Sequence, residues 1–238
     1  MGMFDEQLTA VHRLVERWTA AGSLKELDIR RREPWPPGRS LVLNEDTALE
    51  FGNPGLASVS MLLWGEEAPP GDCGVSLVGP DLAGAEGAGL PFAQVLVAWG
   101  RFDDEYDSYR DLRDAVYDTR LEGLSVRTMP SRQTVWCKVS KEALASGLSL
   151  ADLGGAYTRA LEEVDGVTAA AALFVTSSAK DVALLADAAS GAQRLVDAMM
   201  KMYQEQNFDC ETCEYQDVCD TVMDLKKMRN RLAEDRAG

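Results

Sequence analysis

The residues best suited to chemistry in this sequence are three cysteines near its end. Cys210, Cys213 and Cys219 form a Cys-x2-Cys-x5-Cys pattern, and the chain has only five cysteines in total. A two-residue gap lets a tight turn direct two thiolates at one centre, as in zinc and iron–sulfur sites. We therefore predict that the trio binds a metal ion or a cluster. The alternative is three unmodified thiols on a polar tail.

This set of ligands is incomplete, because structural zinc prefers four ligands. The sequence leaves the fourth open among Cys73, Cys137, a nearby carboxylate, an exogenous ligand and a residue of a partner. Five acids surround the trio: Asp209, Glu211, Glu214, Asp217 and Asp220. They are expected to raise the thiol pKa and to lower the reduction potential of a cluster, unless they only form a solvated face.

The location expected for these cysteines argues against a disulfide framework. The opening residues, MGMFDEQLTAVHRL, lack the basic start and apolar core of a signal peptide, and no apolar run is long enough to span a membrane. We therefore expect a cytoplasmic protein without membrane association. An odd number of cysteines in that compartment is poorly explained by disulfides.

Charge and histidine content exclude further classes of protein. The formal net charge is −15, which disfavours binding to nucleic acid or to anionic lipid. His12 is the only histidine, so sites built from several histidines are excluded. We expect His12 to have a structural or solvent-facing role. The sequence also shows no recognisable catalytic acid–base pair and no nucleophile motif.

Around the cysteines, the chain divides into three parts. Residues 1–39 hold a helix over 4–21, in which apolar residues recur at helical spacing, and a connector rich in proline and arginine. Residues 40–205 read as an α+β domain. Residues 206–238 hold the cysteines and a C-terminal helical tail.

Within the α+β domain, stretches rich in β-branched and large apolar residues predict strands. The five main stretches are 41–51, 57–64, 92–99, 133–139 and 167–176, and VSLVGPDL predicts a further short strand. Helices are expected over 103–121, over 149–164 with a capping box from Ser149 and Asp152, and over 178–206 with an interruption near Gly191. Strands and helices do not alternate regularly along the chain, which favours one mixed or largely antiparallel sheet packed with helices.

The order of several segments resembles a known family. LEFGNPGLASVSMLLW, VSLVGPDLAGAEGAGLPFAQVLVAWGR and TVWCKVSKEALASGLSLADLGGAYTRAL precede a long helix and then CETCEYQDVC. This order and spacing is similar to that of the acetyl-CoA synthase subunit of the CO dehydrogenase/acetyl-CoA synthase complex. The resemblance covers roughly residues 45–222, which correspond to the family's middle domain and the entry to its cluster-bearing domain.

The resemblance implies a role in anaerobic one-carbon metabolism. Cys210 and Cys213 match the first pair of cluster ligands in the family, whereas Cys219 matches the third only if three residues are deleted. The family's fourth ligand and its later Cys-Gly-Cys have no counterpart here, so complete acetyl-CoA synthase activity is not expected. We expect a stand-alone accessory protein that binds an iron–sulfur cluster, with zinc as the alternative. Its expected partners are the complex itself, a corrinoid protein or methyltransferase components.

The resemblance also implies binding of CoA, because the family's middle domain binds CoA near a tryptophan and several arginines. Forked guanidinium groups suit the phosphates of CoA. The alternative function is therefore a CoA- or acyl-CoA-binding enzyme or sensor. The candidate residues are Arg127, Arg132, Trp136, Arg110 and Arg113. A plainer interpretation is that Arg110, Arg113 and Arg120 form a solvated helix face, paired with neighbouring aspartates.

Overall fold

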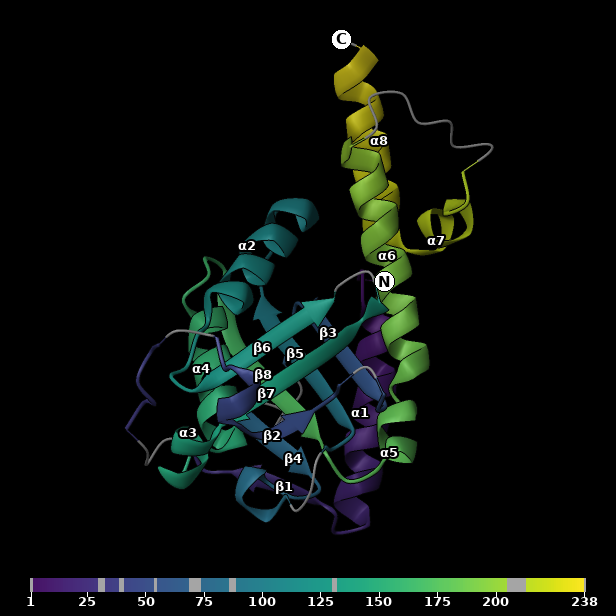
Figure 1. The fold of residues 1–238 in the computed structure, drawn as a ribbon. Coiled ribbons are helices and arrows are strands. Elements are labelled where there is room, and N and C mark those ends of the chain that lie inside the picture. The colour runs from purple at the N-terminus through teal and green to yellow at the C-terminus, as the bar shows by residue number, and fades with distance from the viewer. Residues whose placement is uncertain are drawn as a thin grey trace.

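Two β-sheets packed with helices make up the described part of the chain (Figure 1). The computed structural model describes residues 2–29, 33–38, 41–53, 55–68, 74–85, 89–129, 132–204 and 213–237. The mixture of helices and strands confirms the predicted α+β class, with helices at both ends of the chain.

The larger sheet has five strands in the order β1-β4-β8-β5-β3. The strands are β1 (Leu24–Leu27), β3 (Ser58–Gly65), β4 (Gly74–Val78), β5 (Phe92–Gly100) and β8 (Val167–Val175). The β3–β5 and β4–β8 pairs are parallel, while β1–β4 and β5–β8 are antiparallel. Every residue of β5 is buried, as expected for an internal strand covered on both faces.

The smaller sheet has three antiparallel strands in the order β2-β7-β6. These are β2 (Thr47–Phe51), β6 (Leu124–Met129) and β7 (Thr134–Ser140). All five main predicted stretches therefore contain strands. The expectation of one sheet was wrong, because the stretches 41–51 and 133–139 pair with each other in a second sheet. Local alternation identifies a strand but not its partner, and β1 and β6 were missed as strands.

Eight α-helices are described. They are α1 (Asp5–Ala20), α2 (Glu105–Asp118), α3 (Lys141–Ala145), α4 (Leu150–Glu162), α5 (Ala179–Ala183), α6 (Ala186–Gln204), α7 (Gln216–Thr221) and α8 (Met223–Ala237). Short 3₁₀ turns lie at Asn44–Asp46 and Leu82–Gly84. The predicted capping box is present: Ser149 Oγ accepts from Asp152 N, and Ser149 N donates to the Asp152 carboxylate.

The predicted interruption near Gly191 was wrong. Helix α6 runs through this glycine, and the break falls earlier, between α5 and α6. A Cβ added at Gly191 would lie 2.8 Å from Gln7 Nε2. Gly191 therefore allows the close approach of α1 and does not end a helix.

Helices α1, α5 and α6 pack along β3, at one edge of the larger sheet. The second half of α6 continues beyond the sheets and runs beside α8, with α7 next to it (Figure 1). We call the end of α6 with α7 and α8 the C-terminal extension. No helix in the described ranges has both the length and the apolar character that crossing a membrane requires.

Candidate ligand pocket and cysteine segment

A pocket of about 540 Å³ lies between the two sheets and the helices α2, α4 and α6. We call it the central pocket. Its interior is largely apolar, with side chains from both sheets and from the three helices. The main interior residues are Leu62, Leu96, Val116, Leu124, Val126, Leu153, Ala192 and Val196. A concave, mainly apolar pocket with a few polar groups is the usual form of a small-molecule site.

Strand register places four neighbouring residues on the floor of the central pocket. Ser60 pairs with Gln94, and Leu62 pairs with Leu96, in the parallel β3–β5 ladder. Because paired residues point to the same face of a sheet, these four side chains share the face that lines the pocket. Val95, the residue between Gln94 and Leu96, points to the opposite face and is buried there.

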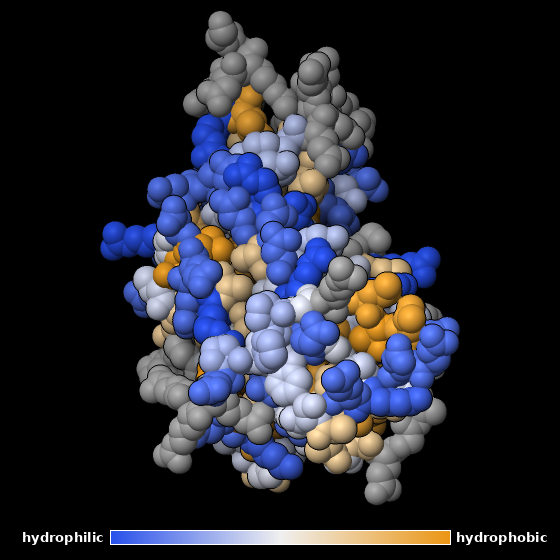
Figure 2. All heavy atoms as spheres, turned by 60° about the vertical axis from the view of Figure 1, so that its left-hand side comes forward, coloured by the Kyte–Doolittle hydropathy of each residue, from blue (hydrophilic) through white to orange (hydrophobic). Residues whose placement is uncertain are grey.

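The mouth of the central pocket carries positive charge. Arg113, Arg120 and Arg127 are the only charged residues among its described lining, and all three are exposed. Tyr117 and Met129 also lie at the mouth and are 70% and 44% exposed. Figure 2 shows separate apolar patches within a mostly hydrophilic surface. In a chain with a net charge of −15, a mouth lined only by cations favours an anionic ligand.

Two of these arginines lie against aromatic rings. The guanidinium carbon of Arg113 is 5.6 Å from the centroid of Tyr109, which also lines the pocket. A hydrogen bond with Asp114 raises the pKa of Arg113. The guanidinium carbon of Arg127 is 5.7 Å from the centroid of Trp136. Such contacts hold each guanidinium flat while its N–H groups remain able to donate.

Gln94 and Tyr157 are buried polar residues of the pocket lining. Gln94, 1% exposed, donates a hydrogen bond to Tyr157, which is 2% exposed. Burial raises the pKa of Tyr157, so its hydroxyl stays neutral. Within the described residues, Gln94 Oε1, Thr134 Oγ1 and Trp136 Nε1 are buried without a hydrogen-bond partner, and the first two belong to residues of the pocket lining. Native structures rarely leave such atoms unpaired, so they indicate a place where a ligand or water binds.

The predicted CoA residues are only partly brought together. Arg113 and Arg127 line the central pocket. Trp136 pairs in register with Arg127 and contacts it, so both side chains lie on the face of the smaller sheet opposite the buried Val135, and Trp136 is not part of the pocket lining. Arg132 is exposed and is not part of the pocket lining. Arg110 is also outside the lining and pairs with Asp107 and Asp111, as the solvated-face interpretation expects.

Sequence reasoning missed Gln94, Thr134 and Tyr157, three polar residues of the pocket lining. One signal was available for Gln94, because it is the only polar side chain in the apolar stretch FAQVLVAWG. A buried glutamine within such a strand requires partners, and that requirement often indicates a site. Thr134 and Tyr157 carry no comparable signal, since their positions depend on how the two sheets meet.

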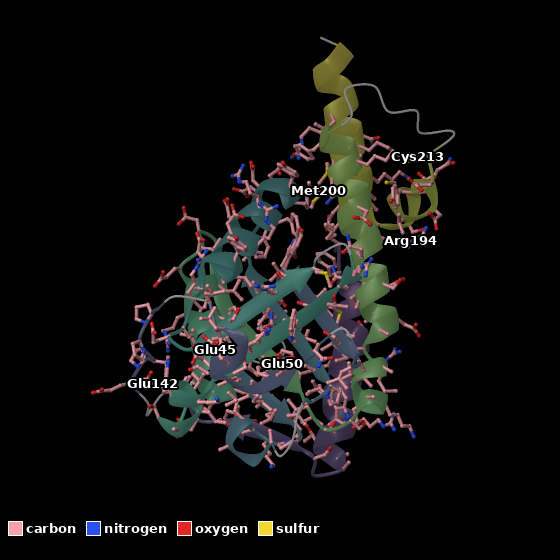
Figure 3. The ribbon with its side chains drawn as sticks, in the orientation of Figure 1. Glu45, Glu50, Glu142, Arg194, Met200 and Cys213 are labelled. Atoms are coloured by element: carbon pink, nitrogen blue, oxygen red, sulfur yellow. The ribbon has the colours of Figure 1, made fainter. Side chains whose placement is uncertain are left out.

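The cysteine segment forms a separate small cavity in the C-terminal extension. Cys213 and Cys219 both line this cavity of about 20 Å³, together with Met202 and Tyr215. Figure 3 shows Cys213 on the side of α6 that faces α7. Cys210 and Cys73 lie outside the described residues. Among those described, no three His, Cys, Asp or Glu side chains come together as metal ligands.

Cys137, one predicted option for a fourth ligand, lies elsewhere. It is fully buried on β7 in the smaller sheet and does not line the cavity of Cys213 and Cys219. Burial raises the pKa of the Cys137 thiol well above its ordinary value. A thiol that stays protonated is a poor nucleophile and a poor ligand, so Cys137 acts as a core residue.

The acids near Cys213 and Cys219 are paired with cations from the flanking helices. Asp217 accepts from Arg194 at 3.0 Å, and Asp220 lies 2.9 Å from Arg229. Glu214 lies 3.5 Å from Lys201. Lys201 and Arg229 also line the small cavity. These pairs fasten the segment to α6 and α8, and they reduce the negative charge that the sequence alone suggests.

A further polar cluster fastens the C-terminal extension to α2. Asp104, the N-cap of α2, accepts hydrogen bonds from Tyr106 N at 2.9 Å and Asp107 N at 3.0 Å. It also accepts from the Tyr203 hydroxyl at 2.9 Å and pairs with Arg231 at 2.5 Å. The Tyr203 ring stacks on Tyr106, with centroids 4.0 Å apart. Helix α2 forms one wall of the central pocket, so this cluster links that wall to the extension.

The pKa values in this cluster reflect its packing. Burial raises the pKa of Asp104, but the hydrogen bonds and Arg231 outweigh burial, so the net shift is downward. Burial and the bond to Asp104 raise the pKa of Tyr203 to about 12. The cluster therefore holds a carboxylate and a neutral phenol near neutral pH.

No family model matches this chain, and no curated protein matches it either.

Proposed function

We propose that this protein binds CoA or an acyl-CoA in the central pocket. The proposal rests on one observation: the pocket has a large apolar interior, and arginines are the only charged residues of its described lining. The interior suits the pantetheine arm and an acyl group, whose burial is favourable. Arg113, Arg120 and Arg127 are placed to donate charge-assisted hydrogen bonds to the phosphates. The resemblance to the acetyl-CoA synthase middle domain supports the same ligand.

Calorimetry with arginine variants tests this proposal. We expect Arg113→Ala to weaken CoA binding about tenfold. This is the lower end of the loss expected for one charge-assisted hydrogen bond, because Arg113 is exposed and already pairs with Asp114. Arg110→Ala is the matched control, since Arg110 lies three residues away on α2 and outside the pocket. Its affinity should stay within about twofold of the wild type. Absence of heat at millimolar CoA, or equal effects of the two variants, would contradict the proposal.

A second candidate function is metal or cluster binding by the cysteine segment. The observation that favours it is that Cys213 and Cys219, six residues apart, line the same cavity. We propose that Cys210, Cys213 and Cys219 together bind an iron–sulfur cluster, with zinc as the alternative. In this role the protein would be an accessory of the CO dehydrogenase/acetyl-CoA synthase system. Its partners would be that complex, a corrinoid protein or methyltransferase components.

Anaerobic purification followed by iron, sulfide and zinc analysis tests this second candidate. We expect stoichiometric iron and sulfide in the wild type, with visible and EPR signals that vanish in a Cys210→Ser/Cys213→Ser variant, because the cluster needs these thiolates. Stoichiometric zinc in place of iron and sulfide would indicate a structural zinc site and not an iron–sulfur cluster. Metal-free protein whose three thiols are freely alkylated, even after attempted cluster reconstitution, would contradict both the iron–sulfur and the zinc proposal.

A further inference from the structure

The free edge of β6 forms one wall of the central pocket. Strand β6 lies at the end of the order β2-β7-β6, so one of its edges has no neighbouring strand within the described ranges. The consecutive residues 126–129 all line the pocket. Their side chains alternate between the two faces of the sheet, so a pocket on one face would meet only every second residue. The pocket therefore runs along the edge of β6, where the backbone is accessible.

The hydrogen-bond pattern shows which backbone groups point to this edge. Opposite residues of antiparallel strands alternate between pairs that bond each other and pairs that do not. Ser140 N donates to the Gly123 carbonyl, one step before the first pair of the β6–β7 ladder. Bonded pairs recur at every second residue, at 125, 127 and 129. The N–H and C=O groups of Val126 and Thr128 therefore point away from β7.

Two contacts on either side of the ladder support this assignment. Val135 lies opposite Thr128, and its backbone N and carbonyl both bond Ser58 Oγ, at 2.9 and 2.6 Å. Leu124 N donates to the Leu121 carbonyl at 3.2 Å and not to β7. Because Leu124 N already has this partner, the open N–H groups of the edge begin at Val126.

Val126 and Thr128 thus present a short row of open backbone groups. Across this edge, no other described residue bonds the backbone N–H or C=O of either one. Thr128 is exposed, and β7 is the only described element that packs extensively against β6. An unpaired strand edge is a template to which an extended chain of amides can add.

We propose that the pantetheine arm of CoA adds to β6 as a short extra strand, with its two amide groups hydrogen-bonded to the backbone of Val126 and Thr128. This inference rests on the proposed binding of CoA. Each amide carries one N–H donor and one C=O acceptor, the partners that a strand edge requires. The open row is short, since it begins at Val126 and β6 ends at Met129. It fits an arm with two amides better than a long peptide strand, and the arginines of the same pocket are placed for the phosphates.

Amide hydrogen exchange followed by NMR tests this contact residue by residue. At saturating CoA, we expect the amides of Val126 and Thr128 to exchange at least about tenfold more slowly, because open N–H groups become hydrogen-bonded. Arg127 and Met129 are internal controls, since their amides already face β7 and should change less. The two halves of CoA separate the arm from the nucleotide. Free 4′-phosphopantetheine should reproduce the alternating pattern, whereas 3′,5′-ADP, which lacks the arm, should not.

A proline variant removes one of the proposed donors. Thr128→Pro deletes an N–H that points to the free edge, where proline is tolerated because no ladder bond is lost. Thr128→Ala keeps this N–H, so the difference between the two variants isolates the backbone contact. By calorimetry, we expect Thr128→Pro to bind CoA about three- to tenfold more weakly than Thr128→Ala, the effect of one lost hydrogen bond.

The outcomes distinguish this inference from the proposed function. CoA binding that leaves the exchange of Val126 and Thr128 unchanged would overturn the inference and leave CoA binding in place. Equal affinities of folded Thr128→Pro and Thr128→Ala would do the same. Absence of CoA binding to the wild type would overturn the proposed function and the inference together. If Thr128→Pro does not fold, the exchange pattern of the wild type decides alone.

Discussion

Filling the central pocket from α6 should abolish ligand binding while leaving the fold intact. Ala192 is 2% exposed and lines the pocket, so Ala192→Phe places a ring inside the space that the proposed ligand occupies. We expect CoA or acyl-CoA affinity to fall about a hundredfold or more, because an apolar arm and a phenyl ring compete for the same volume. The free energy of unfolding should stay within about 1 kcal/mol, since the ring enters existing space.

The control for this prediction lies on the same helix. Ser190 is exposed and is not part of the pocket lining, so Ser190→Phe should bind the ligand as the wild type does. Ala192→Leu should give an intermediate affinity. The measurements are calorimetric titration and denaturant unfolding of each variant. Unchanged affinity in a folded Ala192→Phe protein would show that the ligand binds elsewhere, for instance on the outer face of the smaller sheet around Trp136.

Local sequence signals predicted the elements of the fold better than their arrangement. The apolar run of β5 and the capping box of Ser149 and Asp152 are short-range features, and both are present. The division into two sheets depends on pairings between distant segments, such as Phe51 with Cys137, which no local pattern encodes. Gly191 is a similar case, because its role depends on α1, which lies far away along the chain.

The candidate site shows the same limit. Arginine content indicated an anion site, but only the structure separates Arg113, which lines the pocket, from Arg110 three residues earlier. Helical periodicity explains the difference afterwards: Tyr109, Arg113, Val116 and Tyr117 share one face of α2. Predicting which face turns inward requires knowing that α2 packs beside α4 and α6.

Asp104 is expected to be the most sensitive position for the stability of the C-terminal extension. One carboxylate caps α2, accepts from Tyr203 on α6 and pairs with Arg231 on α8. Asp104→Ala removes all three interactions, and the Asp104 side chain that makes them is only 25% exposed. We expect a loss of about 2–3 kcal/mol in the free energy of unfolding, the sum of a lost N-cap and a lost charged hydrogen bond. Asp104→Asn should lose less, because asparagine also caps helices.

The pH dependence of this contribution has a defined sign. The pKa of Asp104 is lowered from its ordinary value of 3.8 on folding, so its contribution is present above that value. It is lost as pH falls through the lowered folded value. The difference in stability between the wild type and Asp104→Asn should therefore shrink below about pH 4. Glu105 has the opposite shift, since burial, then Asp224 and Asp104, raise its pKa. Asp104→Asn removes the Asp104 charge, so the pKa of Glu105 should be raised less in that variant.

Denaturant unfolding and hydrogen exchange measure this effect, with Asp107→Ala as the matched control. Asp107 lies in the same first turn of α2, but its side chain is 58% exposed and, among the ion pairs described, pairs only with Arg110. We therefore expect Asp107→Ala to change the free energy of unfolding by no more than about 0.5 kcal/mol. Relative to the wild type, Asp104→Ala should speed the exchange of α8 amides more than that of β5 amides. Helix α8 loses its attachment to α2, whereas the internal strand β5 loses no contact. Equal stability of the two alanine variants would show that the packing of Tyr203 on Tyr106 holds the extension in place without the carboxylate.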